Sequence, residues 1–427
     1  MIDRQVHYFI EVNVFIILSA MVDQKPESTG SHLMYTGLMP QEEMLEIGKK
    51  QKKLVLGIPK ENHESEKRIS LTPEAVEVLV NNGHDVLLET HAGDGANYSD
   101  KDYSEHGAFI VESRSQVFGA EIIIKVAPLE DKEIDLLKGN QVIFSSLQIT
   151  RQSQDYIKKL MNKKVTTIAY EYLKNSYGNS PVLQSMSAIS GNAAITIAAE
   201  LLSNNSGGKG IILGGISGIT PTEVIIIGAG TAAEFAARAA IGLGAFVKVF
   251  DTSVQKLDEL QRNLGMRLHT SIFHPQVLTR TLKSADVLIG AVTLHDSGPR
   301  FFVTEEMVKN MKKGSVIIDL SVDQGGCIET SECRSLLEPV YVKHEVVHYS
   351  VPNIPSLVAR TASIAISNII SPIVLEMGNT GGINPLLKER MGVRQGVYIY
   401  NGILTNETIG NRFDIPSKDI NLLMAAF

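Results

Sequence analysis

The chain has 427 residues, of which 44% are hydrophobic and 20% are charged, a length that supports two or three domains with large cores. The formal net charge is −7 and lysine and arginine form no cluster, so nucleic acid is not an expected partner. The two cysteines, Cys327 and Cys333, lie outside any Cys/His cluster, which argues against a disulfide framework or a metal site and favours a reducing cytoplasm.

The first part of the chain is interpreted as a leader rather than as part of a fold. Residues 14–21 form an apolar run that suggests a signal peptide or an anchor, but a bilayer span takes about 20 apolar residues. Glu11 also interrupts the apolar stretch. We therefore expect residues 1–53 to contain a disordered leader, with a later start at Met21 or Met34 as the alternative, and we expect no membrane partner.

From Leu54 onward, short apolar runs alternate with amphipathic segments. Strands are predicted at residues 54–59, 84–90, 120–128, 141–148 and 165–173. Helices are predicted at residues 71–83, 100–107, 131–139 and 151–164. Thr72 is the expected N-cap of the first helix, with Pro73 behind it. Continuous apolar strands between helices are typical of a mostly parallel sheet covered on both faces.

Two segments rich in Ala, Ile and Ser, 185–205 and 356–378, predict long helices, and a second alternation of strands and helices lies between them. We expect these helices to bridge two domains, and residues 384–427 to return to the first domain as helices and loops. The predicted fold class is therefore α/β, with two Rossmann-like doubly wound domains joined by long helices and a cleft between them. The expected domain boundaries are 54–186 plus 357–427 for the first domain and 187–356 for the second.

Residues 222–251 carry a cofactor motif, in which an apolar strand, a glycine turn and an Ala-rich helix follow one another. Gly228 and Gly230 permit the tight turn and the close approach of a pyrophosphate, and Ala233 occupies the third position of the G-x-G-x-x-G/A fingerprint. The amides at the helix N-terminus would bind the phosphates. The next strand ends at Asp251, roughly 20 residues further on, where a carboxylate binds the ribose hydroxyls and repels a 2′-phosphate. NAD is the predicted cofactor, and the second domain is the predicted NAD-binding domain.

Polar residues at strand ends are the candidates for chemistry, because open α/β sheets bind ligands beyond the carboxyl ends of their strands. Lys125 and Gln148 close two strands of the first domain, the predicted substrate domain, and Arg68 follows its first strand. Asp323 closes a strand of the second domain. An arginine can bind a carboxylate with two hydrogen bonds, a lysine can polarise a carbonyl, and an aspartate can exchange a proton. Taken singly, such residues are more commonly solvated strand ends or turn residues.

From about Leu54 to Glu376 the sequence resembles the alanine dehydrogenase family, which includes a subunit of nicotinamide nucleotide transhydrogenase and relatives that act on saccharopine. The matching stretches occur in the family's order: GIPKENHESEKRISLTPEAV, IIIKVAP, GKGIILGGISGITPTEVIIIGAGTAAEFAARAA, SVIIDLSVDQGGCIETS and HYSVPNIPSLVARTAS. The resemblance implies an NAD-dependent enzyme that reversibly converts L-alanine to pyruvate and ammonium. It also implies a homo-oligomer, often a hexamer.

The resemblance further implies roles for individual residues. Arg68 and Lys125 match the residues that hold the carboxylate and the keto oxygen of pyruvate, and Asp323 matches a catalytic acid–base residue beside the nicotinamide. The matches around the cofactor are Asp251 and Lys256 at the ribose, Ser187 near the cofactor, and Asn353 on the nicotinamide side.

This chain departs from alanine dehydrogenases at two positions. They carry a catalytic histidine where this chain has Gln148, at which the transhydrogenase branch also has glutamine, and they usually have glutamate at the position of Ala188. A neutral amide cannot act as a base. Our hypothesis is that Gln148 positions substrate or water while Asp323 transfers the proton, with Lys125 as a further candidate.

Two histidines are alternative sources of the missing imidazole, His295 and His348, each near a strand of the second domain. Two other functions also stay open. One is a dehydrogenase of another amino or imino acid, and the other is an NAD(H)-binding subunit that exchanges hydride only with a partner, as in transhydrogenase. Against the second, Ser187 replaces the aspartate of the Arg-Gln-Asp loop found in that branch.

Overall fold

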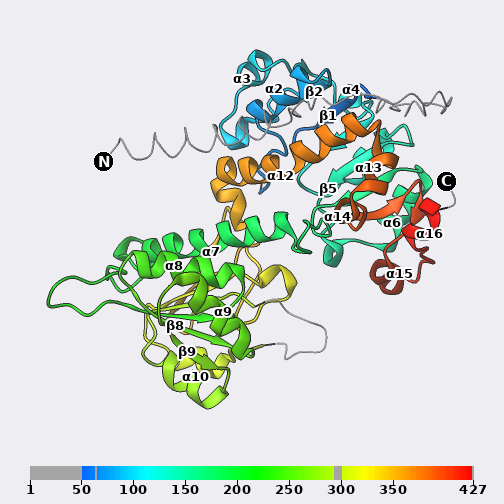
Figure 1. The fold of residues 1–427 in the computed structure, drawn as a ribbon. Coiled ribbons are helices and arrows are strands. Elements are labelled where there is room, and N and C mark those ends of the chain that lie inside the picture. Colours follow the sequence, from blue (N-terminus) through cyan, green and yellow to red (C-terminus); the bar gives the residue numbers. More distant parts are fainter. Residues whose placement is uncertain (1–50, 63–64, 293–300, 426–427) are drawn as a thin grey trace, which may run out of the picture. The chain divides into compact units, whose positions relative to one another are not determined.

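The computed structural model describes residues 51–62, 65–292 and 301–425, whose strands form two sheets (Figure 1). The first sheet has the order β15-β14-β6-β5-β4-β1-β2-β3, and the second has the order β12-β13-β11-β10-β7-β8-β9. In each sheet the parallel strands follow one pattern, in which the first strand pairs with both the second and the fourth. This is the doubly wound order of dinucleotide-binding folds, and it confirms the predicted α/β class.

The first sheet contains every strand predicted for it. Its strands are β1 (Val55–Ile58), β2 (Asp85–Glu89), β3 (Phe109–Val111), β4 (Ile122–Ile124), β5 (Val142–Ser145), β6 (Thr166–Ala169), β14 (Val397–Tyr400) and β15 (Ile403–Leu404). Its helices include α2 (Pro73–Asn81), α3 (Asp100–Glu105), α4 (Arg114–Val117), α5 (Asp131–Leu136), η2 (Ile149–Arg151), α6 (Gln154–Asn162), α13 (Ile383–Glu389), α14 (Met391–Arg394), α15 (Glu407–Phe413) and α16 (Ile420–Ala425). The short edge strand β3 was not predicted.

The second sheet lies between the two long helices in the sequence. Its strands are β7 (Glu223–Ile227), β8 (Phe246–Asp251), β9 (His269–Ile272), β10 (Val287–Gly290), β11 (Val316–Asp319), β12 (Val340–Lys343) and β13 (Val346–Tyr349). Its helices are α8 (Thr231–Gly242), α9 (Val254–Leu264), α10 (Pro275–Leu282), α11 (Glu305–Lys309) and η4 (Val322–Gln324). The antiparallel pair of β12 with β13 adds one edge to an otherwise parallel sheet.

Both sheets are apolar on both faces, as their unbroken apolar runs predict. In β4, Ile122 and Ile124 belong to one hydrophobic core while Ile123 belongs to another. In β7, Ile226 and Ile225 are divided between two cores in the same way. Successive side chains of a strand point to opposite faces, so a continuous apolar run can remain buried only where helices cover both faces.

The C-terminal segment corrects one prediction. It returns to the first sheet as expected, but it adds strands as well as helices and loops: β14 pairs with β6 and with β15, both antiparallel. Asn401 and Gly402 join β14 to β15, with φ of 48° and 80°. An Asn-Gly pair between apolar runs is the strongest short-range signal for a two-residue hairpin turn, because both residues tolerate positive φ. The sequence contained this signal, and the prediction missed it.

The two long helices are α7 (Pro181–Leu201) and α12 (Ala359–Thr380), the latter preceded by η5 (Ile354–Val358). Val182 of α7 packs in a core of the first sheet, whereas Ala194 and Ile195 pack in a core of the second. The one helix α7 therefore contributes to both parts of the fold. By contrast, the buried residues of α12 assigned to a core, such as Ile370, belong to the first sheet's core.

Helix α12 also supports the N-terminus of α2. Thr72 occupies the predicted N-cap position, but its side chain makes no capping hydrogen bond. Instead, the Thr72 N–H donates to Ser367 Oγ at 3.1 Å. The N-terminus of α2 is thus tied to α12.

Within residues 51–62, 65–292 and 301–425, two helical stretches are long and apolar enough to cross a membrane by length and composition, Pro181–Leu201 and Ile354–Thr380. Helices in a protein core pass the same test, and both stretches contribute residues to the cores described above. The predicted leader lies almost entirely outside the described residues, and so does His295. The predicted domain boundaries remain predictions.

The close crossing of α7 and α8 depends on Gly191. A Cβ atom at this position would lie 2.0 Å from the carbonyl oxygen of Ala232. We expect Gly191→Ala to lower the midpoint of thermal unfolding, because overpacking typically costs about 1–3 kcal/mol. Gly242, the last residue of α8, has no atom within 4 Å of its added Cβ. Gly242→Ala is therefore the matched control and should leave the midpoint unchanged or raise it; equal midpoints for the two variants would contradict the packing argument.

Candidate active site

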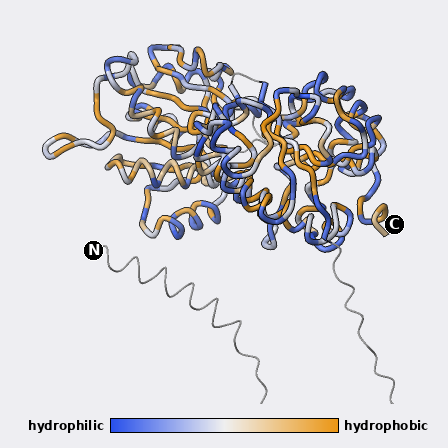
Figure 2. The backbone as a smooth tube through the Cα atoms, turned by 90° about the horizontal axis from the view of Figure 1, so that it is seen from above, coloured by the Kyte–Doolittle hydropathy of each residue, from blue (hydrophilic) through white to orange (hydrophobic). Residues whose placement is uncertain are grey.

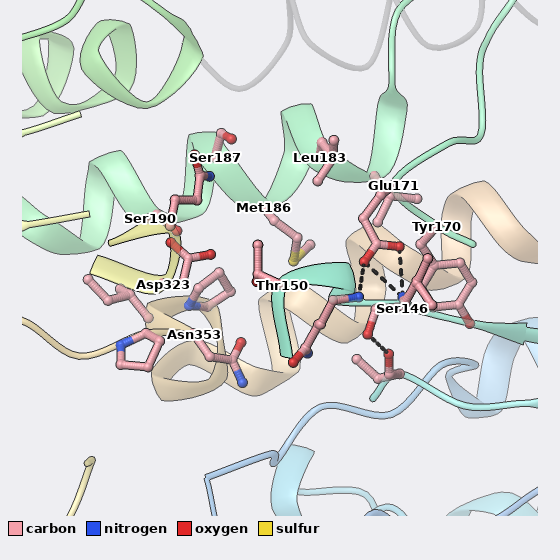
Figure 3. A pocket seen from close by; sticks show the side chains of 18 of the residues that line it. Ser146, Thr150, Tyr170, Glu171, Leu183, Met186, Ser187, Ser190, Asp323 and Asn353 are labelled. Carbon is pink, nitrogen blue, oxygen red and sulfur yellow. Dashed lines mark hydrogen bonds between the residues drawn. The ribbon is translucent and has the colours of Figure 1, made fainter. Parts of the chain in front are cut away.

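A cavity of about 960 Å³ lies at the carboxyl ends of strands from both sheets (Figure 3). From the first sheet it is lined by the loops that follow β5 and β6, and from the second by residues that follow β11 and β13. Helix α7 contributes Leu183, Met186, Ser187 and Ser190 along one side. The doubly wound order predicts a binding site at these strand ends, and the cavity lies there.

The cavity brings together five of the predicted site residues. They come from separate segments of the chain: Arg68, Gln148, Ser187, Asp323 and Asn353. Nearly 300 residues of sequence separate the first of them from the last.

Arg68 is buried and already paired with a carboxylate of the protein. Its Nε and Nη2 donate to Glu66 at 2.7 and 2.6 Å, and its Nη1 lies 3.3 Å from Met186 Sδ. Burial raises the pKa of Glu66, but the charge and hydrogen bonds of Arg68 outweigh it and lower this pKa. A guanidinium has five N–H groups, so Arg68 keeps donors for a substrate carboxylate while Glu66 fixes its orientation.

Asn353 joins the second sheet's side of the cavity to this pair. It follows β13 with a left-handed φ of 64°, and its Nδ2 donates to Glu66 Oε2 at 3.0 Å. Asparagine tolerates this backbone region better than most residues do. The contact connects the predicted nicotinamide-side loop to the carboxylate that orients Arg68.

Lys125 does not line the cavity. Its side chain is 2% exposed, and its Nζ lies 2.7 Å from Glu61 and 3.5 Å from Glu133. Burial raises the pKa of Glu61 to about 7, although the charge of Lys125 opposes this rise. The next residue, Val126, does line the cavity, so the ion pair lies directly behind the wall. The sequence placed Lys125 at a strand end correctly, but its pairing with carboxylates was not anticipated.

Gln148 lies beyond its strand rather than at the end of it. Strand β5 ends at Ser145, and Gln148 adopts a left-handed conformation, with φ of 49° and ψ of 54°, before η2 begins. The sequence therefore predicted the right segment but extended the strand by three residues.

Glu171 is a cavity residue that was not predicted from the sequence. Its carboxylate accepts hydrogen bonds from the backbone N–H groups of Leu147, at 2.8 Å, and Gln148, at 2.9 Å (Figure 3). Burial raises the pKa of Glu171 against these hydrogen bonds. Glu171 follows β6, which ends at Ala169, but the predicted strand extended to residue 173, so the strand-end argument did not select it.

Asp323 also lies beyond its strand, in η4, because β11 ends at Asp319. Desolvation by the surrounding protein raises the pKa of Asp323, and the positive charge of Arg151 opposes this rise. The side chain is nevertheless exposed and lines the open cavity. Arg151 lines the same cavity and was not singled out from the sequence.

His348 does not reach the cavity. It is fully buried in β13, where its Nε2 lies 2.8 Å from Thr330 Oγ1 and its Nδ1 lies 3.0 Å from the carbonyl oxygen of Val346. Burial lowers the pKa of His348 to about 4, so it is neutral at ordinary pH. The hypothesis that His348 replaces the missing imidazole therefore has no geometric basis.

A second hollow, of about 550 Å³, lies at the N-terminus of α8 and is lined by Gly230, Thr231 and Lys256, among others. Gly228 has φ of 105°, and a Cβ there would lie 2.3 Å from the carbonyl oxygen of Ala291. A Cβ on Gly230 would meet no atom within 4 Å, so this glycine opens space for a ligand rather than for the protein's own packing. Ala233 is fully buried and packs inside the second core.

Asp251 ends β8 as predicted. Its two carboxylate oxygens accept hydrogen bonds from the N–H groups of Ala229 and Ser253, both at 2.8 Å. The carboxylate thus holds the glycine turn from the end of the neighbouring strand. The open space at Gly230, the amides of α8 and this carboxylate fit a dinucleotide.

Comparisons with known proteins agree with this geometry. The family models described as alanine dehydrogenase/PNT match residues 57–190 with the N-terminal domain and residues 194–407 with the C-terminal domain. The chain belongs to the alanine dehydrogenase/PNT family. Proteins named alanine dehydrogenase 2 from Staphylococcus aureus strains Mu50 and USA300 are each 37% identical to it over 366 residues, which is 86% of this chain and 98% of theirs.

Solved structures give the same result for the fold. An L-alanine dehydrogenase structure with 34% identity matches with a TM-score of 0.79, covering 84% of this chain and 99% of that one. A transhydrogenase from Sinorhizobium meliloti, with 23% identity and a TM-score of 0.70, covers 83% of this chain and 99% of its own, and it shares the fold. Among the described residues of this family member, no cluster of His, Cys, Asp or Glu is suited to hold a metal ion.

The two glycines of the cofactor motif should respond differently to the same substitution. Gly228→Ala introduces strain at positive φ and a clash, so we expect a lower midpoint of thermal unfolding together with lost NADH binding. Gly230→Ala should leave the midpoint unchanged and weaken NADH binding alone, because its methyl group enters only ligand space. Thermal unfolding and NADH fluorescence titration measure the two effects; a Gly230→Ala protein with wild-type NADH affinity would contradict the assignment.

Proposed function

We propose that this protein is an NAD-dependent alanine dehydrogenase, which converts L-alanine, NAD⁺ and water to pyruvate, ammonium, NADH and a proton, and that it also runs the reverse reaction. The observation that carries the proposal is that Arg68, Gln148 and Asp323 line one cavity. The chain also belongs to this family and has a dinucleotide-binding motif at the start of α8. The reaction needs a carboxylate clamp, an orienting polar group and a proton acceptor, and these three residues have those capacities.

The proposal assigns separate tasks to the two parts of the fold. Residues 54–186 with 357–427 bind the substrate, and residues 187–356 bind NAD. When bound, NAD⁺ would accept the hydride that leaves the Cα of alanine. Glycines 228 and 230 and the start of α8 would hold its phosphates. Asp251 and Lys256 would bind its ribose, Ser187 would lie near the cofactor, and Asn353 would line the nicotinamide side.

Arg68 binds the substrate carboxylate through the N–H groups that Glu66 and Met186 leave available. This contact fixes the alanine Cα against the nicotinamide side of the cavity, and such orientation supplies much of the rate enhancement of a hydride transfer. Lys125 would reach the keto oxygen only after its Nζ leaves Glu61, to which it is bound at 2.7 Å.

Asp323 accepts a proton from the substrate ammonium and releases it to solvent; it then accepts a proton from the water that attacks the imine carbon and returns it to the departing amino group. Its carboxylate lies in the cavity wall. Its raised pKa is closer to the pKa values of the ammonium and water with which it exchanges protons. Gln148 cannot accept this proton. Its amide N–H instead donates to the substrate carbonyl oxygen or orients the attacking water.

An assay separates this proposal from the two alternatives. Purified protein is incubated with NAD⁺ and L-alanine, and then with pyruvate, ammonium and NADH, while NADH absorbance is recorded. Turnover without a partner protein excludes a subunit that exchanges hydride only within a transhydrogenase. Turnover with another amino acid but not with alanine selects the alternative dehydrogenase.

We also propose a cytoplasmic homo-oligomer, with a hexamer as the expected size, formed without a membrane. The Gly-rich loop before β7 exposes Ile212, Ile216 and Ile219, each more than 60% accessible. Figure 2 shows this loop standing out from the neighbouring chain as an apolar segment. Such apolar side chains are expected to be covered by another subunit. Both cysteines are free, in keeping with a reducing compartment.

Asp323→Asn should lower kcat/KM for alanine by about 10²–10⁴-fold, because it removes a positioned proton acceptor. In the wild type, activity should fall as the pH decreases through the pKa of Asp323, which lies above the ordinary range because desolvation disfavours its charged form. This decline should be absent from the residual activity of the variant. Initial rates across pH measure both effects, with NADH affinity as the control. Unchanged turnover of Asp323→Asn would rule out this role.

Gln148→His should increase alanine-dependent turnover, by up to about 10²-fold, since it restores a titratable group at the cavity. Histidine is among the residues that tolerate the left-handed conformation found at this position. Gln148→Asn is the control, because it keeps an amide and the same backbone tolerance without adding a base. Steady-state kinetics compare the two variants. A histidine variant no faster than the asparagine variant would show that Gln148 is not the missing proton-transfer position.

A further inference from the structure

The turn at the tip of β5 has an unusual backbone for the residue it carries. Gln148 has φ of 49° and ψ of 54°, a region that non-glycine residues seldom occupy without support from their surroundings. The turn brings the N–H groups of Leu147 and Gln148 to the same side, where both point at Glu171 (Figure 3). Successive N–H groups arranged in this way form a concave site for an anion.

Glu171 fills that anion site from the neighbouring strand. Strands β5 and β6 are parallel and paired, so Glu171, two residues after β6, lies beside the residues that follow β5. Its Oε1 accepts from Leu147 N–H at 2.8 Å and from Gln148 N–H at 2.9 Å, and its Oε2 lies 3.0 Å from Leu147 N. Both oxygens therefore hold the turn.

We propose that Glu171 is a positioning residue of the reaction, which holds the left-handed turn so that the Gln148 amide faces the substrate. This inference rests on the proposed function and deepens it. Gln148 and Glu171 line the same cavity, and the carboxylate bonds the backbone of the residue whose side chain it orients. Because Gln148 is neutral, it contributes by placement alone, and placement depends on a fixed backbone.

Glu171 differs from Glu66 and Glu61 in its charge pairing, and this difference favours the positioning role over a purely structural one. In the part of the chain that the structure describes, no ion pair to its carboxylate is found, whereas Glu66 and Glu61 are each paired with a basic residue. Holding an unpaired carboxylate in a partly buried place is unfavourable, and burial accordingly raises its pKa. If this position contributed only to stability, a neutral side chain or a paired charge would cost less free energy than an unpaired carboxylate.

A double-mutant cycle tests the proposal. Glu171→Ala and Gln148→Ala should each lower kcat for alanine by about 10- to 100-fold, the range expected when a reacting group is misplaced. NADH affinity should stay within about twofold. The double variant should be no slower than the slower single variant, because both substitutions remove the same contribution. Losses that multiply in the double variant would overturn the proposal.

The conservative variant separates positioning from proton transfer. Glu171→Gln keeps one oxygen that can accept an N–H bond, so it should recover part of the turnover lost in Glu171→Ala. If Glu171→Gln is as slow as Glu171→Ala and loses part of the pH dependence of kcat, Glu171 is a proton-transfer residue and the positioning role is wrong.

Hydrogen–deuterium exchange of a peptide covering residues 141–152 measures the stability of the turn in the absence of substrate. Exchange should be faster in Glu171→Ala than in the wild type and intermediate in Glu171→Gln. The matched control is Asp100→Asn, because Asp100 also accepts a backbone N–H bond, from His91 at 2.8 Å, but lies outside the cavity. Unchanged exchange in Glu171→Ala would overturn the proposal. If the wild type does not turn over alanine but exchange is still faster in Glu171→Ala, only the proposed alanine activity is rejected.

Discussion

Parallel strands place all their carboxyl ends at one edge of a sheet, and the candidate site depends on this constraint. Two sheets whose parallel strands follow the same pattern direct their carboxyl ends to one cavity, where residues 68, 148, 323 and 353 meet although they are far apart in sequence. Helix α7 carries residues of both hydrophobic cores, and its contact with α8 at Gly191 leaves no space for even one methyl group. The relative positions of the candidate residues thus depend on packing that lies outside the cavity.

Two candidate basic residues of the site are each paired with a carboxylate of the protein. Glu66 pairs with Arg68, and Glu61 pairs with Lys125, in each case with little exposure to water. A buried cation without such a partner would be costly, and the partner also fixes the direction of the donors. Arg68 has more N–H groups than Glu66 can use, so it stays competent to bind substrate. The Lys125 side chain is only 2% exposed. The two cations therefore differ in their access to a bound ligand, although both come from segments that follow strands of the first sheet.

Backbone conformation also fixes the positions of candidate site residues. Gln148, Asn353 and Gly228 all have positive φ, and each lies where the chain leaves a strand beside a candidate binding surface. Unfavourable backbone conformations persist where surrounding contacts hold them, and they are common at functional sites. Here the supporting contacts are visible: Glu171 binds the turn at Gln148, and Glu66 accepts from the side chain of Asn353. The neutral amide at residue 148 therefore belongs to a braced turn.

The sequence by itself determined the α/β class, the cofactor motif and most strands, because apolar periodicity, glycine turns and caps are local properties of the chain. It also placed Arg68, Gln148 and Asp323 in segments that follow strands, since parallel sheets bind ligands beyond the carboxyl ends of their strands, although Gln148 and Asp323 lie three and four residues past theirs. Tertiary structure alone decided that Lys125 is paired with Glu61 behind the cavity wall, that His348 is buried in β13, and that Glu171 holds the turn. These outcomes depend on contacts between residues from different strands and loops, and the order of residues along the chain does not specify such distances.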